Sequence, residues 1–225
     1  KFNWQIMKKL IYFGSPAGLE MFLNFLAFSV LISLFHARGD IEATATTIMF
    51  NWDLVSFIPL LGIEIAVTSL VGRYMGAGNP KVAHHAAISG VKTGIFYSIV
   101  ILALFVFIPE TLVRVFHPEI NTEIFEKSVT IAVAMIQIAS LYVLAEAVMV
   151  AFVGALRGAG DTHFTMIASV SAHWLFVPIL YLALNVLNLS VPLSWFFLVV
   201  FFLLFSLVLV FRFKSGKWKT IKVIH

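Results

Sequence analysis

Four acidic side chains lie within or close to long apolar stretches that are typical of membrane-spanning helices. They are Glu20, Asp53, Glu64 and Glu146. An ionised carboxylate at the centre of a membrane helix costs roughly 2.5–3.5 kcal/mol, so several of them would be expensive unless something neutralised them. Ionisable groups in such helices mark sites for ions, protons or charged substrates. We therefore begin from the hypothesis that these acids bind cations, protons or a charged substrate.

The composition is that of a polytopic membrane protein. The 225 residues are 61% hydrophobic and 12% charged, whereas ordinary soluble domains are about half apolar and a quarter charged. This composition excludes a nucleic-acid-binding function, and the lack of cysteine excludes disulfides and thiolate metal sites. Because the chain begins with Lys1 rather than methionine, we expect it to be part of a longer polypeptide.

Six segments with little or no charge predict an all-α fold of six transmembrane helices, since about 20 apolar residues cross a bilayer. Residues 1–13 are polar enough to exclude a signal peptide and predict an interfacial amphipathic helix. Residues 212–225 form a basic tail. The predicted spans are residues 14–35, 47–71, 86–108, 129–155, 164–187 and 192–211.

The distribution of basic residues predicts the orientation of these spans. If both ends of the chain are cytoplasmic, twelve lysines and arginines lie on the inner side and three on the outer side. Cytoplasmic loops of membrane proteins carry such an excess of basic residues. The sequence therefore predicts that both ends are cytoplasmic.

Polar residues of three predicted spans lie at one depth. Asn24, Glu64 and Glu146 are nine to eleven residues from the inner ends of their spans, which corresponds to about 14–17 Å in a core of about 30 Å. Glu20 lies one turn from Asn24 on the same helical face. We predict a shared site at the midplane, with Asp53 nearer the outer mouth and eleven residues from Glu64, on the same face.

Each of these residues also has a purely structural interpretation. A membrane acid can be hydrogen-bonded between helices without a transport role, and Asp53, near the outer end of its helix, can simply be solvated. His173 in the fifth span could pair with an acid, shuttle protons or donate a packing hydrogen bond. His84 and His85 are adjacent and point in different directions, so no metal site is predicted there.

Small and aromatic residues predict how the helices pack. Three tryptophans near span ends, Trp4, Trp195 and Trp218, predict interfacial anchors. Glycines four residues apart permit close helix approach or mark turns. The pairs are Gly14/Gly18, Gly72/Gly76, Gly90/Gly94 and Gly154/Gly158.

Two glycine-rich loops carry the most distinctive motifs. Their sequences are Val71-Gly-Arg-Tyr-Met-Gly-Ala-Gly-Asn-Pro80 and Gly154-Ala-Leu-Arg-Gly-Ala-Gly-Asp-Thr162, and their candidate functional residues are Gly72, Arg73, Gly76, Gly78, Gly154, Arg157, Gly158 and Asp161. Glycine permits tight reversal between helices, and Arg157 is predicted at the level of the lipid phosphates. Neither loop is a nucleotide-binding P-loop, so the chain is not predicted to be an enzyme, and pumping would need an ion gradient or a partner.

In this order and with these flanking spans, the two loops resemble those of the multidrug and toxic compound extrusion (MATE) transporters. The resemblance covers nearly the whole chain, including Gly14-Ser-Pro-Ala-Gly-Leu19 and the basic end, and fits the C-terminal six-helix lobe. It implies a two-lobed protein of a prokaryotic inner (plasma) membrane that exports cationic amphipathic small molecules in exchange for Na⁺ or H⁺. The partners implied are membrane lipid and a missing N-terminal lobe or second six-helix chain; no other cofactor is implied.

The resemblance also assigns roles to particular residues. Glu146 matches an acid that members keep in this helix, and it becomes the main coupling carboxylate. Asn24 stands where some members have an acid, so Glu20, one turn earlier, is expected to supply the charge. Glu64 stands where relatives often have an apolar residue, and it remains a secondary candidate with Asp53 and His173. Carboxylate and amide oxygens suit Na⁺, and a desolvated carboxylate suits H⁺ equally well.

Two other functions remain open at this point. A lipid-linked oligosaccharide flippase of the same superfamily would need basic residues around its cavity to hold pyrophosphate, whereas the candidates at the midplane are acidic. A non-transporting membrane module would complete or scaffold another subunit. The sequence alone does not identify the exported compound or choose between Na⁺ and H⁺.

Overall fold

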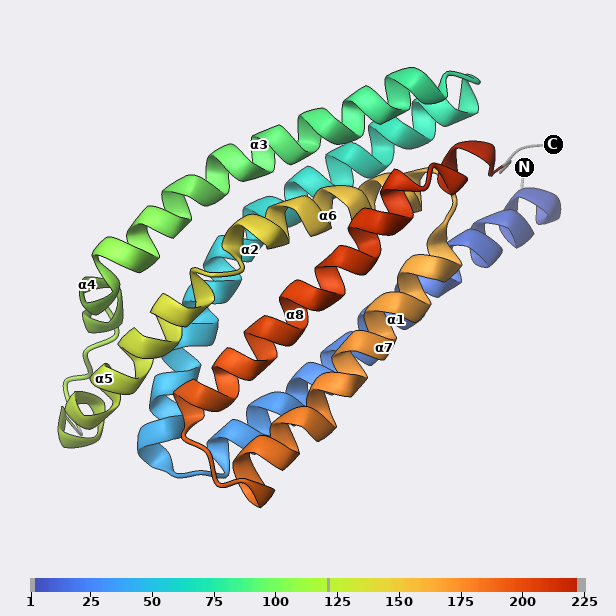
Figure 1. Ribbon diagram of the computed structural model, residues 1–225. Helices are drawn as coiled ribbons and strands as arrows, with labels where there is room; N and C mark the ends of the chain where they lie inside the picture. Colours follow the sequence, from blue (N-terminus) through green and yellow to red (C-terminus); the bar gives the residue numbers. More distant parts are fainter. Residues whose placement is uncertain (1–2, 121, 222–225) are drawn as a thin grey trace.

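The chain folds into a bundle of long helices that lie side by side in the computed structural model (Figure 1). The structure describes residues 3–120 and 122–221, apart from the side chains of Ile6, Lys9 and Phe13. The predicted amphipathic segment and basic tail therefore fall partly on residues 1–2 and 222–225, outside the described residues.

Helix accounts for nearly all of the described residues. The elements are α1 (Trp4–His36), α2 (Asp40–Gly76), α3 (Pro80–Phe107), α4 (Pro109–Arg114), α5 (Thr122–Ala139), α6 (Val143–Gly158), α7 (Thr162–Tyr181), the π-helical turn η1 (Leu182–Val186), α8 (Val191–Lys214) and the 3₁₀ turn η2 (Lys217–Thr220). In this part of the chain, five helices are long and apolar enough to cross a membrane, or six crossings if α5 and α6 form one bent span. The predicted all-α, six-span class is confirmed.

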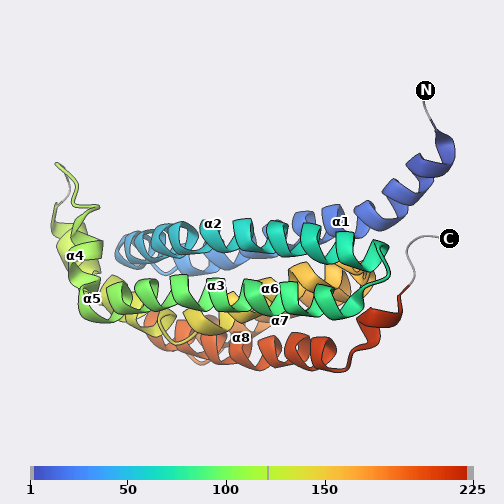
Figure 2. The ribbon, with the colours of Figure 1, turned by 90° about the horizontal axis from the view of Figure 1, so that it is seen from above.

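The bundle has two distinct ends (Figure 1). We call the inner end the one that holds the start of α1, the loops at residues 77–79 and 159–161, and the end of α8. The turns α1–α2 and α7–α8 and the short helix α4 lie at the opposite, outer end. Seen from above, α1 and α2 lie on one side and α8 on the other, and the first turns of α1 lean away from the bundle (Figure 2).

The fourth predicted span contains a break that the sequence did not indicate. Helices α5 and α6 meet at an angle of 52°, although residues 139–143 contain neither proline nor glycine. The Ser140 hydroxyl donates to the Gln137 carbonyl, and such a bond offers the backbone an alternative to the helical pattern. The Trp195 indole N–H donates to the Met135 carbonyl at 3.1 Å, so one of the last carbonyls of α5 has a tertiary partner.

A further difference is a helix that continues where a boundary was expected, and a second helix continues through an internal proline. The predicted interfacial segment is joined to the first span, because α1 runs without interruption from Trp4 to His36 through Pro16. Helix α2 continues through Pro59. Long helices tolerate an internal proline when neighbouring groups satisfy the freed carbonyl.

Glycines determine how closely α6 approaches α2. A Cβ atom on Gly154 would lie 2.6 Å from the Glu64 carbonyl oxygen, and one on Gly158 would lie 2.4 Å from the Thr68 carbonyl oxygen. The predicted close packing is therefore confirmed for this pair. It is also confirmed at Gly90, where an added Cβ would lie 2.2 Å from a Val67 methyl group.

The first glycine pair does not pack in this way. An added Cβ on Gly14 or Gly18 would meet nothing within 4 Å, so of the two possibilities left open for each pair, close packing does not occur here among the described residues. The reason is geometric, because this face of α1 has no neighbouring helix within reach.

Two of the three predicted interfacial tryptophans are instead part of the core. Trp195 is 8% exposed and Trp218 is fully buried. The Trp218 indole N–H donates to the Phe213 carbonyl at 3.0 Å, and its ring stacks on Phe213. Gly216, at φ +69°, allows the reversal that brings Trp218 back onto α8. The interfacial assignment was wrong for these two. Trp218 is buried because the chain after α8 folds back onto the bundle, and Trp195 because α8 packs against α5, where its indole N–H donates to the Met135 carbonyl.

Ion pairs at the outer end are exposed. The Arg114 guanidinium contacts Glu110 at 2.8 Å, and Lys127 contacts Glu123 at 2.6 Å. The hydrogen bond that Arg114 donates to the Glu110 carboxylate raises the pKa of Arg114 above its ordinary value. Both pairs link residues one turn apart on a helix, so they add little to the tertiary fold.

Candidate functional site

Helices α2 and α6 position most of the polar groups predicted to be functional. The two helices run in the same direction, since Gly154 faces Glu64 and Gly158 faces Thr68. Each helix carries two of these groups eleven residues apart, Asp53 and Glu64 on α2 and Glu146 and Arg157 on α6. Eleven residues are about three turns, or about 16 Å, so each pair lies on one helical face. The packing therefore creates two clusters, one above the other.

The first cluster, which we call the Tyr142 cluster, consists of Asp53, Tyr142 and Glu146. The Tyr142 hydroxyl donates a short hydrogen bond to Asp53 Oδ1. The charge of Asp53 acts on Glu146, which is 6% exposed and whose Oε2 is buried without a hydrogen-bond partner. In the described part of the chain, neither acid forms an ion pair with a basic residue. The cluster thus holds two acids in an apolar setting, and its hydroxyl donates to one of them, Asp53.

The helix break between α5 and α6 positions this cluster. Tyr142 is the N-cap residue of α6, and Glu146 lies in the first turn of that helix. The first turn of a helix carries unpaired N–H groups and a partial positive charge, which favours a nearby carboxylate. The break therefore supplies local stabilisation for Glu146 that a continuous helix would not.

The second cluster, which we call the Arg157 cluster, consists of Glu20, Glu64 and Arg157. Arg157 Nη2 lies 2.8 Å from Glu20 Oε1, and Arg157 Nη1 forms a short ion pair with Glu64 Oε1. One guanidinium thus bridges carboxylates from α1 and α2. The sequence placed Arg157 at the level of the lipid phosphates, but the structure turns its side chain toward two buried acids.

A hydrogen-bonded group on α1 and α7 adjoins the Arg157 cluster. The Asn24 amide donates to the Ser169 hydroxyl at 2.8 Å, and His173 Nδ1 is 2.8 Å from the Ser169 carbonyl. The charge of Glu20 acts on His173. Asn24 and His173 therefore belong to the surroundings of Glu20 rather than to those of Glu146.

The structure distributes the predicted midplane residues over two places. Glu20 and Asn24 lie with Glu64 and His173, whereas Glu146 lies with Asp53. Among the described residues, no hydrogen bond or ion pair joins Glu146 to Glu20 or Asn24. Their coupling roles remain predictions, and the geometry separates the main candidate from its two expected helpers.

Sequence reasoning missed Tyr142 as a site residue and missed Arg157 as the partner of the acids. A signal for both was present. Arg157 lies eleven residues after Glu146, and Glu64 eleven residues after Asp53, so equal spacing on two helices indicated matching levels. Tyr142 lies four residues before Glu146 on the same face.

Residues of the two loop motifs make close contacts at the inner end. Arg212 forms a two-point ion pair with Asp161, Nε to Oδ2 at 2.8 Å and Nη2 to Oδ1 at 3.0 Å, and its guanidinium lies 4.5 Å from the centre of the Phe164 ring. A Cβ on Gly72 would lie 3.3 Å from the Gly158 carbonyl oxygen, so the two loops approach each other. Arg73, Gly76 and Gly78 lie at or just beyond the end of α2.

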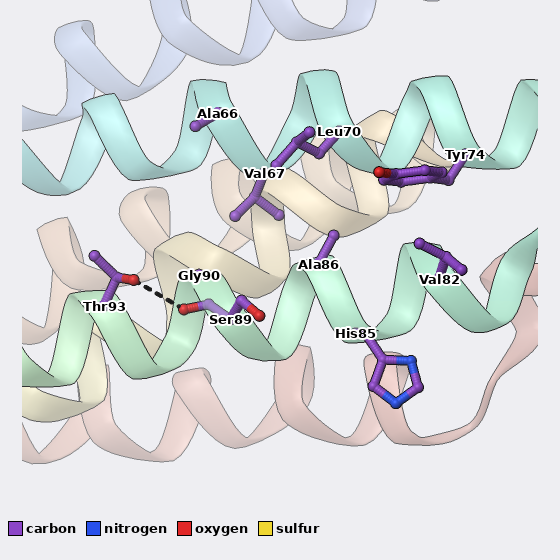
Figure 3. Close-up of a pocket in the computed structure, with 10 residues that line it drawn as sticks. All are labelled: Ala66, Val67, Leu70, Tyr74, Val82, His85, Ala86, Ser89, Gly90 and Thr93. Carbon is purple, nitrogen blue, oxygen red and sulfur yellow. Dashed lines mark hydrogen bonds between the residues drawn. The ribbon is translucent and has the colours of Figure 1, made fainter.

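A separate shallow pocket lies between α2 and α3 (Figure 3). Its volume is about 370 Å³, and its lining includes Val67, Leu70 and Ala86 with the polar residues His85 and Thr93. None of the residues that line it belongs to either cluster. The pocket therefore contributes no group to the candidate site.

Comparison with known proteins identifies the family. The family model described as MatE matches residues 16–182, which is most of the chain. The chain belongs to the MatE family. The matched region contains Glu20, both clusters and both glycine-rich loops, so the predicted resemblance to the MATE transporters is confirmed.

Individual MatE relatives agree with this assignment. The chain is 25% identical over 218 residues to the probable multidrug resistance protein NorM of Thermotoga maritima. The aligned region covers 96% of this chain and 46% of that protein. It is 29% identical over 165 residues to the multidrug resistance protein PmpM of Pseudomonas aeruginosa. This aligned region covers 73% of this chain and 33% of that protein. With bacterial relatives and apolar helices, the chain is a multi-pass protein of the inner (plasma) membrane.

Solved structures share the fold. The eukaryotic MATE transporter AtDTX14 matches with a TM-score of 0.77 and 22% identity, over 96% of this chain and 48% of that one. A MOP superfamily transporter from Pyrococcus furiosus, described as having a binding pocket of reverse polarity, matches with a TM-score of 0.76 and 18% identity, over 92% of this chain and 44% of that one. The MatE chain described here thus spans less than half the length of these relatives.

Proposed function

We propose that this MatE chain is one lobe of a secondary transporter that exports cationic amphipathic compounds in exchange for Na⁺ or H⁺. Its curated relatives are named multidrug resistance proteins, and its length is close to half of theirs. We propose that it is the C-terminal lobe and works with a second six-helix lobe by alternating access. Both chain ends are cytoplasmic in this proposal.

The Tyr142 cluster is the observation that supports ion coupling best. Asp53 and Glu146 lie together in apolar helices without a basic partner among the described residues, and their charges act on each other. Two ionised carboxylates in this setting repel each other and lose hydration, so the pair favours uptake of a cation. Broken helices near the bilayer midplane are where transporters of several folds bind ions.

Each residue of the cluster has a distinct part in the proposed coupling. Glu146 is the main coupling carboxylate, because its Oε2 is buried and unpartnered. Asp53 either binds the same ion as Glu146 or, through its negative charge, strengthens the attraction of Glu146 for that ion. The Tyr142 hydroxyl, which donates to Asp53, keeps that carboxylate oriented while no ion is bound to Glu146. Both Na⁺ and H⁺ fit this donor set, since both bind oxygen atoms that carry negative charge.

The flippase alternative is less well supported by the same geometry. A site for pyrophosphate needs free basic groups, but Arg157 already contacts two carboxylates. The second alternative, a non-transporting module that only completes another subunit, gives no reason for two buried acids to lie together without a counter-ion. Both alternatives predict that the wild-type protein drives no gradient-dependent export of the fluorescent cation, so Glu146→Gln would have no such export to abolish.

The test is efflux of a fluorescent cation by cells that carry the full-length gene, with Na⁺ and pH gradients imposed separately. Glu146→Gln should abolish gradient-driven efflux while leaving the amount of protein in the membrane unchanged. Glu123→Gln, at an exposed acid of the outer end, is the matched control and should leave efflux unchanged. Normal efflux by Glu146→Gln would remove Glu146 from the mechanism.

A further inference from the structure

We propose that the groove between α2 and α3 is a binding site for one anionic phospholipid from the leaflet at the inner end. An acyl chain lies in the groove, and the phosphate lies beside α3 between Lys81 and Lys92. The lipid is held at a defined place, unlike the bulk lipid around the protein. The site does not depend on the proposed transport function, because no residue of either acidic cluster lines the groove.

The shape and lining of the groove are the first reason. Its volume is about 370 Å³. Small side chains leave it open, among them Ala66 on α2 and Ala86 on α3, while Val67 and Leu70 extend from α2 toward α3 and form its floor (Figure 3). A hollow lined mainly by apolar side chains on the surface of two membrane helices fits a hydrocarbon chain.

The length and level of the groove match one leaflet of a bilayer. Its lining on α3 runs from Val82 to Thr93, which is about 16 Å along the helix. The hydrocarbon core of a bilayer is about 30 Å thick, so one leaflet contributes about half of it. Val82 lies in the first turn of α3, at the inner end. The groove therefore follows the course of one acyl chain from the inner end toward the middle of the bilayer.

A row of polar side chains on α3 borders the groove. It consists of Lys81, His85, Ser89 and Lys92, which are all exposed, and their spacing of three or four residues places them on one face of the helix. His85 and Ser89 also line the groove, and the His85 ring points away from α2 (Figure 3). The apolar groove thus has a polar rim on one side.

The charges of this region suit an anion. Residues 65–109 include no aspartate or glutamate, but they include Arg73, Lys81 and Lys92. In the described part of the chain, neither lysine forms an ion pair. Side chains on a helix lean toward its N-terminus, and a lysine in a membrane extends its ammonium group toward the interface. Lys92 therefore extends toward Lys81, and a phosphate between them can interact with both.

A phospholipid is the occupant that satisfies both features of the groove. It supplies a phosphate and an apolar chain together, and basic pockets between membrane helices bind the headgroups of anionic lipids. The basic rim repels a cationic amphipathic compound. A helix of a second lobe would need an acid of its own at the level of Lys92.

The first test counts the lipids that the purified full-length protein retains, by native mass spectrometry after release from nanodiscs. The nanodiscs contain equal amounts of phosphatidylglycerol and phosphatidylcholine with the same acyl chains. The unchanged protein should prefer phosphatidylglycerol. The double variant Lys81→Gln with Lys92→Gln should retain one phosphatidylglycerol fewer and bind it about tenfold more weakly. Equal retention of both lipids by the unchanged protein, or normal retention by the double variant, would overturn the proposal.

The matched control is Lys127→Gln, which removes an exposed lysine at the outer end and should leave the retained lipids unchanged. A loss of lipid equal to that of the double variant would show a general effect of net charge and overturn the site between α2 and α3.

A second variant tests the acyl chain without changing any charge. Ala66 is exposed and lines the groove, so Ala66→Leu fills the groove without disturbing a buried contact. It should remove the retained phosphatidylglycerol although both lysines are present. A photo-crosslinking residue in place of Ser89 then identifies the occupant in cell membranes. An adduct with the mass of a phospholipid is expected, and a crosslink to another part of the protein would overturn the proposal.

Discussion

The Tyr142 cluster and the Arg157 cluster both lie where α2 packs against α6, about three turns apart, and Glu20 of α1 completes the second one. They differ in how their acids are balanced. Each contains two carboxylates. In the Arg157 cluster a guanidinium bridges them, whereas in the Tyr142 cluster a neutral hydroxyl donates to one of them, Asp53. The acids of the Arg157 cluster are thus neutralised in part by an ion pair, whereas those of the Tyr142 cluster have no cationic side chain as a partner among the described residues.

Because of this difference, mutations in the two clusters should affect fold stability and ion coupling to different degrees. Removing a cation partner from buried acids destabilises the fold, because the remaining charges are left unpaired. Removing a carboxylate that has no cation partner relieves repulsion instead. We therefore expect stability to depend mostly on the Arg157 cluster and ion coupling mostly on the Tyr142 cluster.

The largest effect on stability is expected for Arg157→Met. This change leaves Glu20 and Glu64 without their shared cation, at a cost on the order of 3 kcal/mol. Thermal unfolding of the purified protein should show a clearly lower midpoint. Adding Glu20→Gln and Glu64→Gln to the same variant should restore most of the loss, and failure of this rescue would show that charge balance is not the cause.

The next largest effect is expected for Gly158→Ala. The new Cβ would lie 2.4 Å from the Thr68 carbonyl oxygen, so α2 and α6 must move apart, at a cost of about 2 kcal/mol. The same displacement separates Arg157 from Glu64. Gly18→Ala is the matched control because an added Cβ there meets nothing within 4 Å, and an equal drop in both midpoints would contradict the packing argument.

A smaller loss is expected for Tyr142→Phe. The change removes the hydroxyl that donates to the Asp53 carboxylate and should cost about 1 kcal/mol. Its effect on coupling should be more evident than its effect on stability, as a weaker apparent affinity for the driving ion in the efflux assay. A change in the unfolding midpoint with an unaltered ion dependence would place Tyr142 among the structural residues.

The smallest effect is expected for Lys127→Ala at the outer end. This side chain is 58% exposed and pairs with Glu123, which is 82% exposed. Exposed pairs of this kind are screened by water and salt, so neither the unfolding midpoint nor efflux should change measurably. A large effect would show that the loops of the outer end take part in the function.

Much of the fold followed from hydropathy alone, because crossing a bilayer requires about 20 apolar residues whatever their tertiary neighbours. The break at residues 140–142 did not follow, since no proline or glycine marks it and its hydrogen bonds come from Ser140 and Trp195. Depth counting indicated Glu64 and Glu146 as site candidates. It could not show that Arg157 extends toward the acids, because the length and direction of a side chain are not part of a count along the helix.

The residue types and their spacing determined that this MatE chain has acids within apolar helices, two of which, Asp53 and Glu64, lie eleven residues apart on one face of α2. They also determined the glycines that permit close approach. The partner of each acid was decided by the parallel packing of α2 against α6 and by the break before Val143, since a pairing depends on distances between side chains from remote parts of the chain. For that reason Glu146 is held beside Asp53 and Tyr142, and Glu20 beside Glu64 and Arg157.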